Sequence, residues 1–210
     1  MLKLFDTNYI DTFQFTGSVF SEFGFDKCTR FINKMLGNNT FRYTSITNES
    51  LELLQKYHNL FGDRLFSHEV CINFEVRDNF DLGMIPYADK NNIKTVAYQP
   101  LRRNRTALRN WPLLIELSKK YKKSQNQIIL SWLISNNYLP LTKSESINHI
   151  NEYLEAQNIV LDREDLQKMN DFRVPNYKSP KIDWNKSGDG IDVSQLSNVF
   201  DEEYEKQQKI

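Results

Sequence analysis

The sequence predicts an α/β protein whose parallel strands and outer helices form an incomplete (β/α)8 (TIM) barrel. Segments typical of strands alternate with amphipathic helical segments along most of the chain, as in parallel sheets. No G-x-G-x-x-G follows a strand and no G-x-x-x-x-G-K-[ST] occurs, so the two best-known phosphate loops of open doubly wound sheets are absent. The chain has about five such strands, whereas a closed barrel needs eight βα units and about 250 residues.

The first half of the chain carries three predicted strands, each followed by a helix. The strands are rich in β-branched and aromatic residues and cover residues 9–15 (YIDTFQF), 41–47 (FRYTSIT) and 65–73 (LFSHEVCIN). Helical spacing of apolar residues predicts helices over residues 26–36, 49–61 and 82–91. Gly37 and Gly62 stand where the first two helices should end, and Asn48 precedes the second helix as a capping residue.

The second half continues the alternation and then changes in composition. Strands are predicted over residues 94–98 and 139–142, separated by the polar loop 99–109 and two helices. The predicted helices cover residues 112–122, 124–136 (with Ser124 as its N-cap), 147–156 and 162–172. From Arg173 onward Pro, Lys, Asp and Gly are frequent, so residues 1–172 are expected to form the barrel part and residues 173–210 a tail or lid.

Composition excludes several classes of protein. Lys plus Arg and Asp plus Glu both number 27, so no overall charge indicates nucleic acid or an anionic membrane surface as a partner. No apolar run approaches the ~20 residues of a transmembrane helix, and the start of the chain lacks a signal-peptide pattern. Cys28 and Cys71 have no metal-ligand spacing, and His68 beside Glu69 has no third ligand, so no metal site is expected. Free thiols favour a reducing, cytoplasmic location.

Three separated blocks of sequence resemble successive blocks of the aldo-keto reductases in order and spacing. They run from ITNESLELL to NFEVRDN (46–79), from IPYADKNN to YQPLRRN (85–104) and from KKSQNQII to INEYLEA (122–156). The opening LKLFDTNYID resembles the segment leading into that family's fourth barrel strand, and the resemblance covers roughly residues 2–172. It implies a TIM barrel that binds NADPH in extended form at the carboxyl ends of the strands, and carbonyl reduction as the activity.

The resemblance places the first three strands of the family barrel ahead of Met1. In the family those strands carry a catalytic Asp, Tyr and Lys, and the Tyr is the general acid whose pKa the Lys lowers. A fourth catalytic residue, a His, falls at Thr16 in this sequence, and Thr cannot donate to and orient a carbonyl as His does. No catalytic residue is therefore assigned, and the chain is expected to be a truncated reductase that is inactive alone.

The resemblance also implies residues that hold the nicotinamide end of the cofactor. Thr47 and Asn48 stand where the family has a Ser-Asn pair that binds the carboxamide, and Tyr98 stands at the aromatic position that stacks on the ring. Glu69 replaces a Gln at the same amide; an ionised Glu can accept from the amide NH2 but cannot donate to its carbonyl. Gln99, Pro100 and Leu101 follow Tyr98 where the family commonly has Ser-Pro-Leu, so Gln99 stands at the position of the Ser.

A second set of residues is implied at the adenosine end. Lys143 and Ser144 match a Lys-Ser pair that binds the 2′-phosphate, Glu152 is retained, and Tyr153 departs from a family Asn. His149 stands where an Arg often stacks on adenine, and it keeps a flat ring without the permanent charge. The loop that commonly covers the pyrophosphate contains Arg102, Arg103 and Arg105. Read without the family, Tyr98 would be a core aromatic and the Arg-rich run a solvated loop.

Three hypotheses about function remain open. The chain is a truncated NADP(H)-dependent oxidoreductase acting on aldehyde or ketone carbonyls, or it is one subunit of a split reductase completed by another chain. The third hypothesis is a non-catalytic interaction module, whose exposed strand edges are covered by self-association or by a partner.

Overall fold

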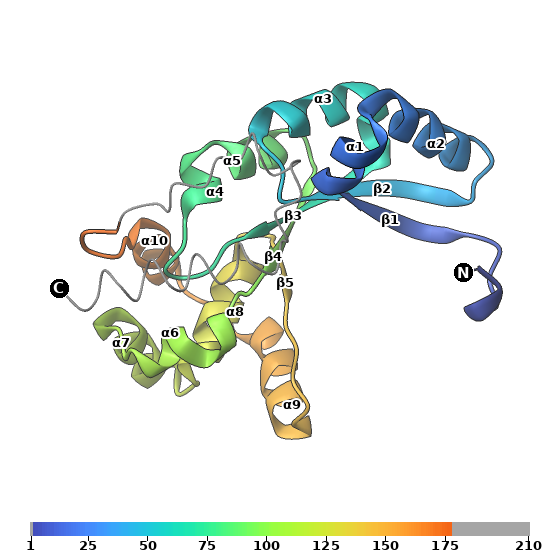
Figure 1. The fold of residues 1–210 in the computed structure, drawn as a ribbon. Helices are drawn as coiled ribbons and strands as arrows, with labels where there is room; N and C mark the ends of the chain where they lie inside the picture. The colour runs from blue at the N-terminus through green and yellow to red at the C-terminus, as the bar shows by residue number, and fades with distance from the viewer. Residues whose placement is uncertain (1, 178–210) are drawn as a thin grey trace. The chain divides into compact units, whose positions relative to one another are not determined.

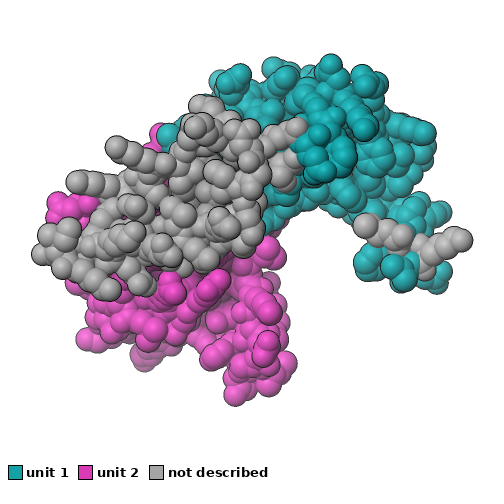
Figure 2. Space-filling view, viewed as in Figure 1, with its two compact units in different colours: residues 1–69, 82–93, 178–210 teal, residues 70–81, 94–177 magenta. Residues whose placement is uncertain are grey.

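The computed structural model describes residues 2–177, and the predicted tail beyond them lies outside the described residues. The described chain forms two compact units, shown in separate colours in Figure 2. Unit 1 comprises residues 2–69 and 82–93, and unit 2 comprises residues 70–81 and 94–177. The expected boundary between a barrel part (residues 1–172) and a tail (residues 173–210) stays a prediction.

Five parallel strands with helices between them confirm the predicted α/β class (Figure 1). The order of strands in the sheet follows the order in the chain, and the sheet is not closed, as expected of an incomplete barrel. The strands are β1 (Ile10–Thr16), β2 (Phe41–Thr47), β3 (Leu65–Cys71), β4 (Lys94–Tyr98) and β5 (Leu139–Leu141).

Unit 1 packs its helices on the apolar face of β1, β2 and β3. Its helices are α1 (Gly17–Phe23), α2 (Phe25–Gly37), α3 (Leu51–Phe61) and α5 (Met84–Lys90), with 3-10 turns at Leu2–Leu4 and Gly62–Arg64. Phe15, Phe41 and Ile46 from the strands join Phe20, Tyr57 and other helix residues in one buried cluster. Aromatic rings dominate this core, with Phe13 and Phe41 stacked at 4.5 Å between centroids.

Unit 2 is built around helix α8. Its elements are α4 (Asp78–Asp81), α6 (Arg105–Leu108), α7 (Pro112–Tyr121), α8 (Gln125–Ser135), α9 (Ile147–Glu155), α10 (Arg163–Asp171) and 3-10 turns at Arg102–Asn104 and Ala156–Asn158. Ser124 caps α8 as predicted, in a capping box whose second member is Gln127. Trp132 is 1% exposed, its Nε1 donates to Asn170, and the Arg77 guanidinium lies over its ring. Unit 2 therefore has its own core.

Several local predictions need correction. Helix α2 includes Gly37, so this glycine is not its stop; Asn39, with φ of 58°, makes the reversal. Ser50 rather than Asn48 caps α3, because the Ser50 side chain accepts from the Leu53 N–H. Strand β3 ends at Cys71 instead of residue 73, since the Asn73 side chain turns the chain by accepting from two backbone N–H groups.

Candidate functional site

In unit 1 the ends of β2 and β3 bring together the three residues predicted to hold a carboxamide. The Glu69 carbonyl oxygen accepts from the Thr47 hydroxyl at 3.2 Å and from the Asn48 N–H at 3.0 Å. Asn48 has φ of 53°, a left-handed conformation that Asn tolerates better than most residues. These two hydrogen bonds hold Thr47, Asn48 and Glu69 close together at the ends of β2 and β3.

The Asn48 side chain is the strongest sign of a ligand site in unit 1. It is 5% exposed, and its Oδ1 has no hydrogen-bond partner among residues 2–177. Buried polar atoms are nearly always satisfied, and an exception needs an explanation such as an absent ligand. A ligand amide N–H is the kind of group that this oxygen would accept from, so the residues present fit a nicotinamide carboxamide.

Unit 1 has a polar sheet face opposite its apolar core. The register of the strands places Gln14 beside Ser45 and Ser45 beside Ser67, with Thr16, Thr47 and Glu69 in the next row. The Ser45 and Ser67 hydroxyls are 2.8 Å apart, and Gln14 Nε2 donates to Glu69 Oε2 at 2.9 Å. His68, the neighbour of Glu69, is 2% exposed, and burial lowers its pKa to about 4.

Thr16 ends β1 beside Thr47, at the position where the resemblance predicts the family His. Gly17 follows it, and a Cβ built on this glycine would come within 1.9 Å of the buried Glu49 carboxylate. A larger residue at this position would require the Glu49 side chain to move.

In unit 2 a cavity of about 350 Å³ opens at the ends of β4 and β5. We call it the strand-end cavity. Its lining includes Gln99, Leu101, Lys143, Ser144 and His149, five of the predicted site residues, with Arg103, Asn104 and Tyr153. Lys143, Arg103 and His149 are exposed, so two exposed permanent cations and one imidazole border the space, in addition to the buried Arg102. Tyr98 ends β4 and is half-buried, but it does not line this cavity.

Glu152 lies apart from the strand-end cavity. The Glu152 carboxylate accepts from the Ser124 hydroxyl, and the Glu152 backbone carbonyl accepts from Gln127 Nε2 at 3.1 Å. Glu152 therefore stabilises the start of α8. His149 and Tyr153 stack with centroids 6.1 Å apart on α9, whose N-cap is Ser146. The Ser144 hydroxyl accepts from the Ser146 N–H at 3.1 Å, which fixes the turn between β5 and α9.

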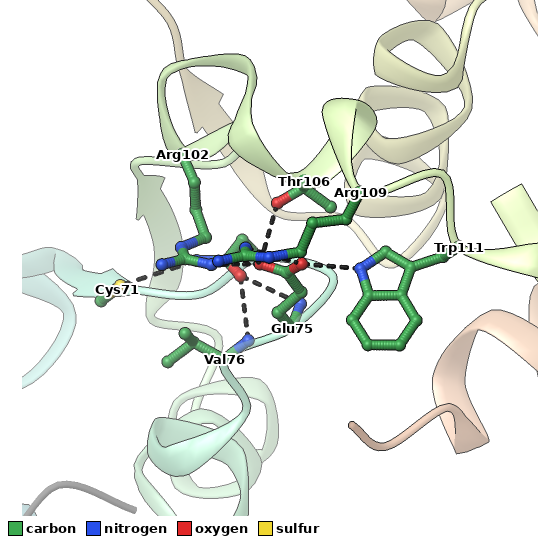
Figure 3. Close-up of polar contacts among 8 residues, drawn as sticks. Cys71, Glu75, Val76, Arg102, Thr106, Arg109 and Trp111 are labelled. Atoms are coloured by element: carbon green, nitrogen blue, oxygen red, sulfur yellow. Dashed lines mark hydrogen bonds and ion pairs between the residues drawn. The ribbon is translucent and has the colours of Figure 1, made fainter. Parts of the chain in front are cut away.

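The Arg-rich loop holds a feature that the sequence did not reveal, shown in Figure 3. Arg102 also lines the strand-end cavity, but it is 2% exposed and donates to the Glu75 carboxylate, so it is not a solvated loop residue. Thr106 donates to this carboxylate at 3.1 Å, Arg109 at 2.9 Å and Trp111 Nε1 at 2.6 Å. A single charged residue, Glu75, in the run INFEV was the only sequence signal for this arrangement.

The anchored loop carries three successive left-handed residues, Arg102, Arg103 and Asn104, with φ of 47°, 54° and 71°. Each non-glycine residue in this region costs on the order of 1 kcal/mol or more and persists only where its surroundings impose it. The Glu75 hydrogen bonds and the Asn126 amide, which donates to Asn104 at 2.8 Å, supply that constraint. The exposed Arg103 thereby stays at the rim of the strand-end cavity.

Other kinds of site find no support in the part of the chain that the structure describes. No three His, Cys, Asp or Glu residues are grouped there in a way that could hold a metal ion. No helix within residues 2–177 is long and apolar enough to cross a membrane.

The fold is that of part of an α/β barrel, with polar residues at the carboxyl ends of its parallel strands. The sequence profile of the aldo/keto reductase family matches residues 1–173, and the chain belongs to that family. Aldose reductase C of Dictyostelium discoideum is 32% identical over 88 residues, which are 42% of this chain and 27% of that protein. The NADPH-dependent alpha-keto amide reductase of Saccharomyces cerevisiae is 28% identical over 110 residues, 50% of this chain and 35% of that protein.

Solved structures agree with this assignment. The thermostable aldo-keto reductase Tm1743, solved with the inhibitor epalrestat, superposes with a TM-score of 0.69 at 25% identity, over 80% of this chain and 62% of that one. A variant of Gox0644 in complex with NADPH superposes with a TM-score of 0.73 at 15% identity, over 88% and 66%, and shows the fold alone. The chain thus spans about a third of the length of its curated relatives and under two thirds of Tm1743.

Proposed function

We propose that this chain supplies the cofactor-binding part of an NADP(H)-dependent oxidoreductase that reduces aldehyde or ketone carbonyls. The observation that carries the proposal is the buried Asn48 side chain, whose Oδ1 lacks a hydrogen-bond partner among the described residues and lies beside Thr47 and Glu69. A bound nicotinamide would supply the hydride. Asn48, Thr47 and Glu69 would orient its carboxamide.

In unit 2 the proposal assigns the adenosine end to residues of the strand-end cavity. Lys143 and Arg103 offer positive charge to phosphate groups, and Ser144 offers a hydroxyl at the start of the turn into α9. His149, stacked with Tyr153, offers a flat ring to a base. The name of the yeast relative, an NADPH-dependent reductase, supports the choice of NADP(H) over NAD(H).

The acid–base step of the reaction is not assigned to any residue of this chain. The family's His position is Thr16, whose hydroxyl has no accessible cationic form and cannot replace an imidazole. Within the proposal, the proton donor comes from sequence outside these 210 residues, either in the same polypeptide or in a complementing chain. The 210-residue chain is expected to bind cofactor without turning over carbonyl substrates.

Cofactor titration of the purified chain tests the proposal. Quenching of tryptophan fluorescence by NADPH should saturate, with NADH binding at least about tenfold more weakly if Lys143 contacts the 2′-phosphate. Lys143→Met should abolish most of that preference. Lys119→Met removes the same charge from an exposed position of α7 and should leave it unchanged. A folded chain that binds neither nucleotide would refute the proposal.

A second candidate function is an interaction module, and exposed apolar side chains in unit 2 favour it. Leu139 and Leu141 of β5 are 45% and 56% exposed, and Ile147 of α9 is 66% exposed. Exposed apolar surface of this kind is typical of a surface that another chain or segment covers. Size-exclusion chromatography over a range of concentrations, with and without NADPH, separates the candidates: association that ignores nucleotide supports the module.

A further inference from the structure

Glu69 puts an acidic side chain at the nicotinamide end of the proposed site. It is half-buried at the end of β3, and its backbone carbonyl is the acceptor that ties Thr47 and Asn48 to the same place. No Lys, Arg or His within residues 2–177 forms an ion pair with it. Its negative charge is therefore not cancelled by a neighbouring cation.

The Gln14 side chain fixes how the Glu69 carboxylate is presented. Gln14 Nε2 donates to one oxygen, Oε2, at 2.9 Å from the neighbouring row of the polar sheet face. A neutral amide donor orients the carboxylate while it leaves the charge in place, unlike a Lys or an Arg at the same position. Within the described residues 2–177 the other oxygen, Oε1, is left to accept from a ligand.

We infer that Glu69 makes this site select the oxidised cofactor, NADP+, over NADPH. The inference rests on the proposed function, since it assumes that a nicotinamide binds beside Asn48 and Glu69. NADP+ carries a positive charge on its nicotinamide ring and NADPH does not, whereas their phosphates are identical. A carboxylate near the ring therefore stabilises one redox form and has little Coulombic effect on the other.

The size of the preference follows from partial exposure. Interactions between charges near a protein surface are weakened by water and salt, so we expect roughly a threefold to tenfold effect rather than a larger one. Both cofactor forms make the same contacts elsewhere, so the ratio of their dissociation constants isolates the charge on the ring. In the cell, such a site would respond to the balance of the two forms as well as to their total concentration.

Isothermal titration calorimetry with NADP+ and NADPH tests the inference on the wild-type chain and on Glu69→Gln. The substitution keeps the shape and removes the charge. The ratio of the NADPH to the NADP+ dissociation constant should fall by roughly threefold to tenfold in Glu69→Gln. Glu52→Gln removes one charge from an exposed position of α3 in the same unit and should leave the ratio unchanged.

The outcomes separate this inference from the proposed function. Wild-type protein that binds neither form refutes the proposed function itself. Binding of both forms with the same ratio in wild type and Glu69→Gln overturns the role of Glu69 alone. If Glu69→Gln does not fold, the wild type still decides: raising NaCl from about 50 to 500 mM should shrink its preference for NADP+ by screening. A preference that ignores salt would contradict the inference.

Discussion

Glu69 in unit 1 and Glu75 in unit 2 are two carboxylates with opposite surroundings. The Glu75 side chain is fully buried and accepts from Arg102, Thr106, Arg109 and Trp111, as Figure 3 shows. The Glu69 side chain is half-buried and, among residues 2–177, accepts from a single amide, that of Gln14. The first carboxylate has its lone pairs occupied by the protein, whereas the second has capacity left for a ligand.

The comparison shows how partners decide what an acidic residue does. A buried carboxylate must be paired and hydrogen-bonded, because desolvation of an isolated charge is too costly. Glu75 meets this requirement through its hydrogen bonds to the loop that contains Arg102, Arg103 and Asn104. Its role is structural. Glu69 keeps access to water and needs no cation. Its negative charge can therefore interact electrostatically with a bound molecule.

The largest expected effect comes from Glu75→Gln. It leaves the buried Arg102 guanidinium without its carboxylate, and breaking a buried ion pair in this way typically costs about 3–5 kcal/mol. The free energy of unfolding, measured by urea denaturation, should fall by that amount. Glu69→Gln is the matched control and should cost less than about 1 kcal/mol. Similar losses for both variants would show that the two carboxylates contribute equally to stability.

His68, the buried neighbour of Glu69, should make the stability of the protein depend on pH. Burial lowers the pKa of His68 from 6.5 to about 4, so its neutral form is favoured in the folded state. Between these two values the unfolded chain binds a proton that the folded chain does not, so stability falls as the pH falls from 6.5 to about 4.

The loss should approach about 3 kcal/mol at the acidic end, since one pKa unit is 1.36 kcal/mol. Urea denaturation at a series of pH values measures it. His68→Gln should lack this part of the pH dependence, and the difference between the two curves removes the shared titration of other groups. Parallel curves for the two proteins would show that His68 is not held neutral by burial.

Most of the fold could be predicted because local sequence carries it. The strands 41–47 and 94–98 match β2 and β4 to the residue, since their β-branched and aromatic runs have clear ends. Ser124 was predicted as a cap because the capping signal is local. Helix α1 was missed: GSVFSEF is short, follows β1 directly and has no side-chain cap.

The candidate site was predictable only in part. Resemblance to a family indicated Thr47, Asn48 and Glu69, and the strand ends do bring these three together. The hydrogen bonds to the Glu75 carboxylate could not be foreseen. Their donors lie 27 to 36 residues further along the chain, and no periodicity links them to Glu75. Glu152 was assigned by family position, whereas its contacts with Ser124 and Gln127 depend on how α9 packs against α8.

The smallest expected effect concerns Gln14→Leu, which removes the one donor to the Glu69 carboxylate among residues 2–177. Gln14 is exposed, and water can replace the lost hydrogen bond, so the free energy of unfolding should change by no more than about 0.5 kcal/mol. The substitution should nevertheless weaken the preference for NADP+ over NADPH, because the Glu69 carboxylate would then adopt more than one orientation. If Gln14→Leu cost more than about 1.5 kcal/mol, Glu69 would depend on its partner as Glu75 does. The distinction between a carboxylate satisfied by the protein and one open to a ligand would then fail.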